Sequence, residues 1–376
     1  MLSSPTTGLG TGGRFRPRDL SAPWRHVDVA LLVAVGLVVL IGSAMVYSAT
    51  RTMSGGPGYV LRHAVFIVVG VVLMAGISLV DYRRIADWWQ VLYGLSIVLL
   101  LGVLSPLGAT VNGTKGWYRF GPFTLQPAEF AKLAVIIAVA AYLGSAERVD
   151  LRRLAIALGL FAVPTGITLL QPDLGSALVF IVVALGMLVV GGVQMRHLLV
   201  LVVLGIVAVV GILNSGTLDQ YQTDRLTSFV SPTGQSYNVD QAQKAIGSGG
   251  LTGYGFTKGP QTRGGYVPEQ ETDFIFTVAG EELGFLGAGG LVLLLGLIVW
   301  RIWRIAQLAA DPLGTLICVG ILSMFLFHIF ENIGMTLGIM PVTGIPLPFV
   351  SYGGSSMLTS FAAVGLVQSV HMHRFA

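Results

Sequence analysis

Long apolar runs separated by polar segments dominate the chain. A helix needs roughly 20 residues to cross the hydrocarbon core of a membrane. The runs that approach this length are residues 29–47, 60–80, 89–107, 130–143, 154–170, 178–193, 198–213, 283–302, 316–340 and 356–372. We therefore predict an all-α integral membrane protein with about ten transmembrane helices and with both termini on one side of the membrane.

The polar segments between the runs are short, with one exception. Residues 214–272, between the seventh and eighth runs, are too many for a simple connection between neighbouring helices. Such a segment is usually functional, and we expect one large extracytoplasmic loop here, between helices 7 and 8. Residues 1–25 are rich in Gly, Ser, Thr, Pro and Arg and predict a disordered cytoplasmic tail, which leaves residues 26–376 as a polytopic membrane domain.

Composition and charge agree with this interpretation. Apolar residues make up 54% of the chain, charged residues 11%, and the mean hydropathy is +0.79, an apolar excess that one soluble core cannot bury. The net charge of +4 does not indicate nucleic-acid binding, because the cations lie in the segments between the apolar runs. Starting the chain inside places most arginines on the cytoplasmic face, so the positive-inside rule predicts cytoplasmic termini.

Candidate chemistry concentrates in residues 267–284, which read VPEQETDFIFTVAGEELG. Asp273 lies where the long polar segment meets an apolar helix, and Glu281 and Glu282 come just before the next apolar run. Ionisable side chains at a membrane boundary are costly unless something pairs or uses them, so these carboxylates predict a functional site. We expect residues 273–282 to extend the helix outward or to lie at the interface, with Asp273 and Gly284 on one helical stripe.

A second polar group begins the fourth run. Glu129 and Lys132 lie three residues apart and share one face of a helix that starts at Pro127. The pair either neutralises itself so that the span can insert, or faces a substrate. In the second case Lys115 and Arg119 on the preceding loop add positive charge for an anionic head group.

Three local signals complete the pattern. Asp173 follows the fifth run and is a favoured residue for capping the next helix. Residues 340–356, MPVTGIPLPFVSYGGSS, carry repeated Pro and Gly at membrane depth, which implies irregular backbone that packs against protein or lines a cavity. The single cysteine, Cys318, falls within an apolar run and predicts a buried structural thiol.

Together these stretches resemble the SEDS family (shape, elongation, division and sporulation), the multi-pass polymerases of bacterial cell-wall synthesis. The matching motifs are NGTKGW at 112–117, QPAEFAK at 126–132, QPDLGSA at 171–177, IGSGGLTG at 246–253, PEQETDFIF at 268–276 with EELG at 281–284, and GIPLPFVSYGGSS at 344–356. They cover most of the chain from the third run onward, in the order of the family. Two of them, PVTGIPLPFVSYGGSS and IGSGGLTG, are more similar to RodA, the elongation member, than to FtsW, the division member.

The resemblance implies a peptidoglycan glycosyltransferase that polymerises lipid II into glycan strands at the outer face of the bacterial cytoplasmic membrane during cell elongation and shape maintenance. It implies a class B penicillin-binding protein as the transpeptidase partner, besides lipid II and membrane lipid. In this family the acidic residue of the TDFIF motif is essential, and here it is Asp273. The matched residues that line or support the family's central cavity are Lys115, Trp117, Glu129, Lys132 and Asp173.

Polymerising lipid II requires a sugar hydroxyl to displace pyrophosphate at an anomeric carbon. We expect Asp273 to be the general base, with Glu281 and Glu282 supporting it. Cations or a divalent metal must stabilise the departing pyrophosphate. The candidate cations are Lys115, Arg119, Lys132, Arg225 and Lys244. Gly116 stands where many members have Arg before the Trp, which leaves open which cation meets the pyrophosphate.

No His or Cys cluster has metal-ligand spacing, so we expect oxygen ligands, phosphates included, to hold Mg²⁺ or Mn²⁺, and no organic cofactor. A lipid II flippase is the main alternative function, since an amphipathic cavity with charged residues can also pass a head group. The carboxylates cluster at one face, however, whereas a transport path needs polar residues through its depth. An ion-coupled transporter and a noncatalytic scaffold are two more rival functions, and a scaffold should tolerate Asp273→Ala.

Overall fold

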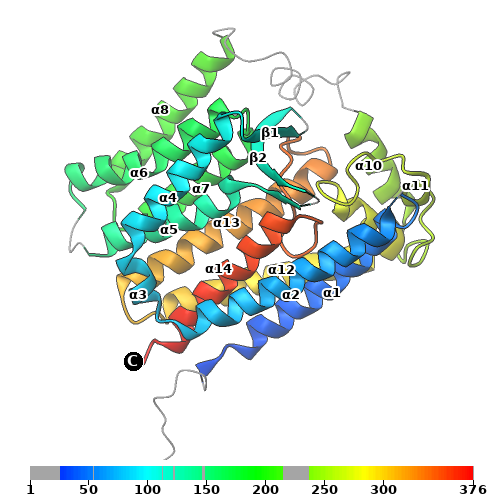
Figure 1. Ribbon diagram of the computed structural model, residues 1–376, viewed down its shortest axis with the longest axis horizontal. Helices are drawn as coiled ribbons and strands as arrows, with labels where there is room; N and C mark the ends of the chain where they lie inside the picture. Colours follow the sequence, from blue (N-terminus) through cyan, green and yellow to red (C-terminus); the bar gives the residue numbers. More distant parts are fainter. Residues whose placement is uncertain are drawn as a thin grey trace, which may run out of the picture.

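The computed structural model describes residues 26–53, 55–111, 113–121, 123–145, 149–214 and 237–375, with side chains outside 206–214. Most of these residues form a bundle of long helices (Figure 1). The helices are α1 (Val29–Thr50), α2 (Gly56–Leu79), α3 (Tyr82–Asp87), α4 (Trp89–Leu104), α5 (Pro127–Gly144), α6 (Leu151–Leu170), α7 (Leu174–Val190), α8 (Met195–Asn214), α10 (Tyr237–Ser248), α11 (Pro260–Gly264), α12 (Ile275–Gln307), α13 (Pro312–Thr336) and α14 (Gly354–Met372).

Each predicted apolar run corresponds to one helix of the bundle. Among the described residues six helices are long and apolar enough to cross a membrane, namely α1, α2, α5, α6, α12 and α13. Three more, α4, α7 and the part of α8 up to Gly205, are apolar but shorter. The prediction of a mostly helical multi-span membrane protein is confirmed, and the count of ten spans stays a prediction.

A small antiparallel sheet is the element that the apolar pattern does not predict. Its strands are β1 (Gly108–Val111), β2 (Thr114–Phe120) and β3 (Phe123–Leu125), in that order. Val111 pairs with Thr114, and Gly113 between them has a φ of 81°, a value that favours glycine in a tight hairpin turn. The sheet rests on α4, because the Tyr118 hydroxyl donates to the Leu99 carbonyl at 3.0 Å.

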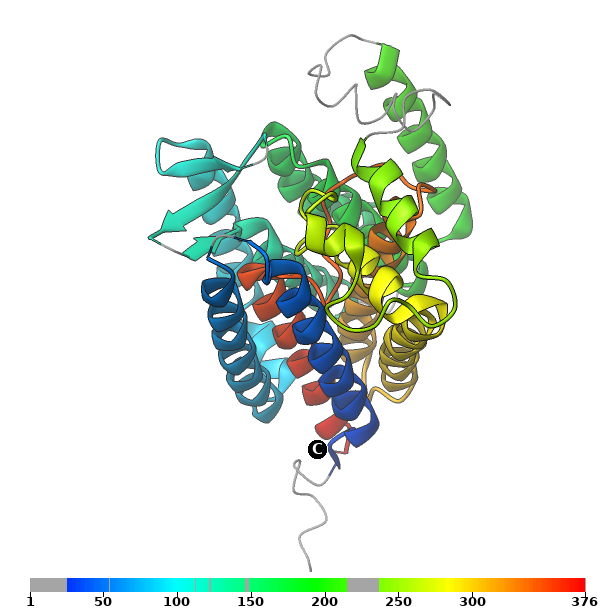
Figure 2. The same ribbon diagram turned by 90° about the vertical axis from the view of Figure 1, so that its right-hand side faces the viewer.

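The two ends of the described chain lie together. The Asp28 N–H donates to Gln368 Oε1 at 3.0 Å, and Gln368 Nε2 donates to the Asp28 carbonyl at 2.9 Å. Arg301 from α12 forms an ion pair with the Asp28 carboxylate at the same place. Figures 1 and 2 show the sheet, α10 and α11 toward the opposite end of the bundle from the C-terminus. The bundle therefore returns to its starting end, as an even number of spans requires.

The helix that follows the long polar segment differs from the prediction in two ways. α12 begins at Ile275, so Asp273 precedes the helix instead of lying on its face. The helix is also interrupted at Gly284, where φ is 67° and ψ is −170°. The backbone around this break pairs with residues 250–255, and the Phe285 N–H donates to the Gly250 carbonyl at 2.8 Å. The expected stripe from Asp273 to Gly284 is wrong, because neither end of it is helical.

Candidate active site

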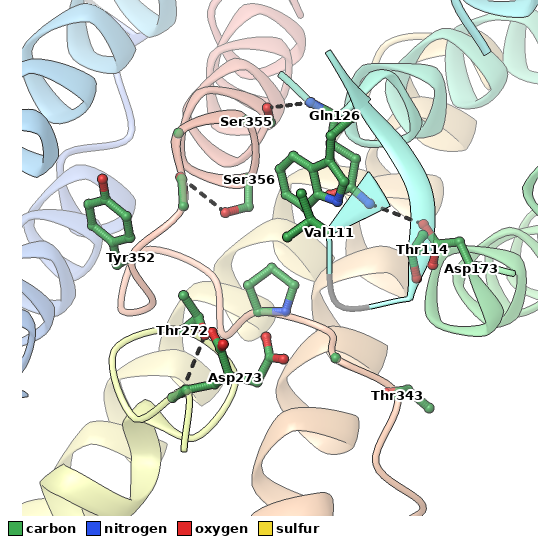
Figure 3. A pocket seen from close by; sticks show the side chains of 16 residues that line it. Val111, Thr114, Gln126, Asp173, Thr272, Asp273, Thr343, Tyr352, Ser355 and Ser356 are labelled. Atoms are coloured by element: carbon green, nitrogen blue, oxygen red, sulfur yellow. Dashed lines mark hydrogen bonds between the residues drawn. The ribbon is translucent and has the colours of Figure 1, made fainter. Parts of the chain in front are cut away.

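A cavity of about 210 Å³ lies beside the sheet. Its lining comes from the sheet with Gln126, from Asp173 before α7, from the turn before α12, and from the loop between α13 and α14 with the first residues of α14. Figure 3 shows Asp273 on one side of the cavity and Gln126 and Asp173 on the other. Of the predicted site residues, Asp273, Trp117 and Asp173 are thus brought together around one space.

The backbone beside the Asp273 carboxylate is held from two directions. The buried Asn332 amide of α13 donates to the carbonyls of Asp273 and Ile345, each at 2.8 Å. The Ser351 hydroxyl donates to the Thr272 carbonyl at 2.6 Å. Hydrogen bonds of this kind fix the turn to both α13 and the following loop. Asp273 is therefore presented to the cavity by a rigid support, the condition for a positioned catalytic group.

Gly344 leaves room next to that carboxylate. Its φ is 76°, in the left-handed region that glycine adopts readily. A Cβ at this position would lie 3.3 Å from Asp273 Oδ2, closer than ordinary van der Waals contact. The neighbouring Thr343 hydroxyl donates to Glu331 Oε1 at 2.9 Å, which ties the loop to α13. The loop backbone thus approaches Asp273 without filling the space that a ligand needs.

The opposite wall is built on Asp173. Its carboxylate caps α7, as predicted, by accepting the Ser176 N–H at 2.9 Å. The Ser176 hydroxyl at 2.8 Å and Gln126 Nε2 at 3.0 Å donate to the other oxygen. The Gln126 N–H in turn donates to Ser355 Oγ at 2.9 Å, so this wall joins α5, α7 and α14. Asp173 is both a structural cap and a polar group on the cavity wall.

Glu129 and Lys132 lie inside the bundle and not on this cavity wall. The two side chains form an ion pair at 2.6 Å and are 4% and 2% exposed. Lys132 Nζ also lies 3.2 Å from Nε2 of the buried His328 on α13. The geometry matches the alternative in which the pair neutralises itself, and it adds a partner from a distant helix.

The other candidate cations that the structure describes, Lys115, Arg119 and Lys244, are also absent from the lining of the cavity. Lys115 donates to the Leu104 carbonyl at 2.8 Å and so caps the C-terminal end of α4. Lys244 forms a surface ion pair with Asp240 at 2.5 Å. Arg225 lies outside the described residues. Among the described residues, the cavity lining contains carboxylates but neither Lys nor Arg.

The predicted supporting carboxylates hold a loop. Glu281 accepts the Gln261 N–H at 2.7 Å and the N–H and hydroxyl of Thr262 at 2.9 and 2.6 Å. Glu282 accepts the Ser48 hydroxyl at 2.5 Å and the Thr257 N–H at 2.9 Å. Both side chains are fully buried. They anchor residues 257–262 to α12 and α1, and neither of them lines the cavity.

Several cavity residues were not singled out from the sequence. Gln126, Glu269, Tyr352 and Ser355 line the space together with Asp273. Each of them falls within a motif that carries the family resemblance, which is the signal that points to them. Their individual roles depend on contacts across the bundle, which spacing along the chain does not encode.

Glu271 is buried next to the cavity-lining turn, and its Oε2 has no hydrogen-bond partner among the described residues. Burial raises the pKa of this carboxyl above its ordinary value of 4.5, the Glu269 charge adds to the rise, and the hydrogen bond of its own N–H opposes it. A carboxyl whose pKa is higher in the folded protein than in the unfolded chain lowers the free energy of unfolding as the pH rises. The loss begins near the unfolded-state pKa and is complete above the folded-state pKa.

Glu271→Gln is therefore expected to unfold at a higher temperature than the wild type at mildly alkaline pH, because the variant has no carboxyl to ionise. The difference in unfolding temperature should disappear as the pH falls below the ordinary carboxyl pKa, where the wild-type group is protonated in both states. Thermal unfolding across this pH range is the measurement. Equal unfolding temperatures at every pH would contradict the expected cost of ionising Glu271.

Comparison with known proteins agrees with the fold. Long apolar helices with a carboxylate-lined cavity at one end of the bundle are the features of a polytopic membrane protein with a polar binding site. The chain belongs to the SEDS family, since the family of cell cycle proteins FtsW, RodA and SpoVE matches residues 25–375. The family prediction from the motifs is confirmed.

Relatives with three different names are similar to this chain. Stage V sporulation protein E of Bacillus subtilis is 36% identical over 91% of this chain and 96% of the relative. Peptidoglycan glycosyltransferase MrdB of Escherichia coli is 34% identical over 93% of this chain and 94% of the relative. A probable peptidoglycan glycosyltransferase FtsW of Trichlorobacter lovleyi is also 34% identical. Because similar relatives include SpoVE, MrdB and FtsW, the subfamily is not resolved, and the assignment to RodA rather than FtsW stays a prediction.

Two solved structures share the fold over nearly the whole chain. RodA of Thermus thermophilus is 32% identical with a TM-score of 0.72, over 94% of this chain and 99% of that one. A chain of a peptidoglycan synthase complex is 32% identical with a TM-score of 0.78, over 93% of this chain and 98% of that one. The helical fold described above is therefore that of RodA.

Proposed function

We propose that this chain is a peptidoglycan glycosyltransferase that joins lipid II units into glycan strands. The observation that carries the proposal is Asp273 on the wall of a polar cavity, with Asn332 bonded to its carbonyl and Ser351 bonded to the carbonyl of the preceding Thr272. Curated relatives, MrdB among them, are peptidoglycan glycosyltransferases. A fixed carboxylate beside a space bounded by hydrogen-bonding groups fits the activation of a sugar hydroxyl.

In the proposed reaction the acceptor's sugar hydroxyl attacks the anomeric carbon of the donor. The O–H bond breaks as its proton passes to Asp273, and the new C–O bond forms as the bond from the anomeric carbon to the diphosphate oxygen breaks. The diphosphate leaves with the electron pair, still attached to its prenyl chain. Trp117 offers an aromatic surface and Gln126 an amide on the cavity wall, groups suited to orienting a sugar.

The cavity fits a divalent cation only with help from the substrate. Among the described residues no three His, Cys, Asp or Glu side chains gather as a metal site. Glu269 and Asp273 nevertheless both line the cavity, and Mg²⁺ is commonly held by one or two carboxylates together with substrate phosphates. Mg²⁺ or Mn²⁺ held in this way would neutralise charge on the departing diphosphate.

The finer assignment extends the same proposal. We place the protein in the bacterial cytoplasmic membrane with both termini cytoplasmic, so that the cavity faces outward. The motif similarity to RodA supports a role in cell elongation and shape, and the matched chain from a peptidoglycan synthase complex supports a class B penicillin-binding protein as partner. A partner of that class would cross-link the strands made at this cavity.

The test is a polymerisation assay with the purified protein, lipid II and a divalent cation, beside an assay for movement of fluorescent lipid II across vesicles. A glycosyltransferase makes glycan strands on a gel in the presence of a transpeptidase inhibitor. A flippase, the alternative function, moves the lipid without making strands. Transport without any polymer would overturn the proposed function.

Gly344→Ala tests whether the space beside Asp273 matters. The variant is expected to polymerise more slowly, because the new methyl group crowds Asp273 Oδ2 and the left-handed backbone costs an alanine about 1–2 kcal/mol. Polymerisation rate and unfolding temperature are measured together. Gly255→Ala, which also has a positive φ but lies away from the cavity, is the control for strain alone and should keep its activity.

A further inference from the structure

A row of polar side chains lies near the C-terminal end of α13. His328, Glu331 and Asn332 are three and four residues apart, so they share one face of the helix. All three are buried. Polar side chains inside a membrane-spanning helix are costly, and they are functional candidates by default. The row is therefore a place to look for groups that serve the cavity.

The row faces the cavity loop, residues 343–346, which follows α13 and carries part of the cavity lining. Each side chain of the row bonds one residue of this loop, in the pairs Glu331–Thr343 at 2.9 Å, Asn332–Ile345 at 2.8 Å and His328–Pro346. Three successive contacts from one rigid helix fix the course of the loop backbone along the cavity.

The cavity loop is also enclosed from the side of α7. A Cβ at Gly175, in the first turn of α7, would lie 2.9 Å from the Thr343 carbonyl oxygen and 2.9 Å from Ile345 Cγ1. On the other side of the loop, a Cβ at Gly344 would lie 3.3 Å from Asp273 Oδ2. The loop is thus packed between α7 and α13, and its position decides how close its backbone comes to the Asp273 carboxylate.

Glu331 is the member of the row whose described contacts serve the loop alone. Asn332 also donates to the Asp273 carbonyl, and His328 lies beside Lys132. Within the described part of the chain Glu331 has no ion-pair partner, and its Oε2 has no hydrogen-bond partner. In Figure 3 the Thr343 side chain points away from Asp273. The Glu331–Thr343 bond therefore anchors the loop and leaves the space beside Asp273 open.

We propose that Glu331 is a positioning residue for Asp273: through Thr343 it holds the cavity loop, and Gly344 with it, at a fixed distance from the carboxylate. Glu331 is absent from the described lining of the cavity, so it acts through the loop and not on the substrate. A displacement of about 1 Å at a reacting group can cost about 10²-fold in rate. The proposal rests on the proposed function for its reaction, but the order of the loop can be measured without turnover.

The first test measures kcat and KM for lipid II in the polymerisation assay. Glu331→Met keeps the length of the side chain and removes the acceptor, so kcat should fall about tenfold through misplacement of the base. KM should change by less than about twofold, because an interaction made with the base and not with the bound substrate leaves ground-state binding unchanged. Glu331→Gln should recover most of the rate, because its amide oxygen still accepts the Thr343 hydroxyl.

Thr343→Val removes the other half of the bond with little change in shape, and it should lower kcat as Glu331→Met does. The double variant Glu331→Met/Thr343→Val should be no slower than the slower single variant, because both substitutions break the same bond. Effects that multiply in the double variant would overturn the proposal. Wild-type kcat in a folded Glu331→Met protein would overturn it as well.

Ser369→Ala is the matched control for loss of a buried hydrogen bond. The Ser369 hydroxyl donates to the Val80 carbonyl at 2.6 Å, near the C-terminal end of α14 and outside the cavity lining. This variant should unfold at a lower temperature and keep its kcat. A fall in kcat as large as that of Glu331→Met would show that any buried hydrogen bond matters equally, and would overturn a specific role for Glu331.

Hydrogen exchange of the full chain in detergent separates this proposal from the proposed function. The amides of residues 343–345 should exchange faster in Glu331→Met than in the wild type, and at the wild-type rate in Glu331→Gln and Ser369→Ala. Unchanged exchange in Glu331→Met would overturn the tether and leave the polymerase proposal standing. Faster exchange in a protein whose wild type makes no polymer would support the tether and overturn the polymerase.

Discussion

Asp273→Asn is expected to stop glycan polymerisation while leaving the protein folded. The amide keeps the shape of the side chain but cannot take the proton from the attacking hydroxyl. Loss of a general base typically costs about 10²–10⁴-fold in rate. The measurement is the rate of strand formation from lipid II by the purified variant. Asp273→Ala should show the same loss, because both substitutions remove the base.

The control for this prediction is Asp240→Asn. Asp240 is an exposed carboxylate on α10 that pairs with Lys244 and does not line the cavity. The variant should keep its polymerisation rate, since surface ion pairs contribute little. Strand formation by Asp273→Asn at the wild-type rate would remove the proposed base from the mechanism, whatever the overall activity of the protein.

Lys132→Met is expected to destabilise the protein strongly. The substitution leaves the Glu129 carboxylate buried without its ammonium partner, which typically costs about 3–5 kcal/mol. The measurement is thermal unfolding in detergent, together with the yield of folded protein. Polymerisation should be lost only as far as folded protein is lost, because neither side chain lines the cavity.

The double variant Glu129→Gln/Lys132→Met separates structure from substrate binding. Without either charge, the interior should recover most of the stability that the single variant loses. Recovery of stability together with activity supports a self-neutralising pair. A double variant that is stable but does not bind lipid II would show instead that the pair faces the substrate.

The long helices of the bundle could be predicted because each of them contains a long apolar run that is visible in the sequence. Ten apolar runs marked ten helices, and local spacing indicated both the Glu129–Lys132 pair and the cap at Asp173. Contacts of this kind join residues within one turn of a helix, so the sequence records them directly. The cavity itself could be anticipated only through the resemblance of its motifs to a family.

What the pattern does not predict depends on distant contacts. The apolar pattern predicts a polar loop in the segment where the sheet lies. It misses the strands because they are short and lie outside the membrane-length runs. Glu281 and Glu282 are close to Asp273 along the chain, yet their partners are Ser48 and the segment 257–262.

The interruption of α12 at Gly284 divides the helix into a short piece before the break and a longer apolar piece that runs on to Gln307. The backbone at the break is bonded to residues 250–255. Spanning helices adapt to membranes of different thickness by changing their tilt. We therefore expect the longer piece to change its tilt about Gly284 while the turn that carries Asp273 keeps its contacts.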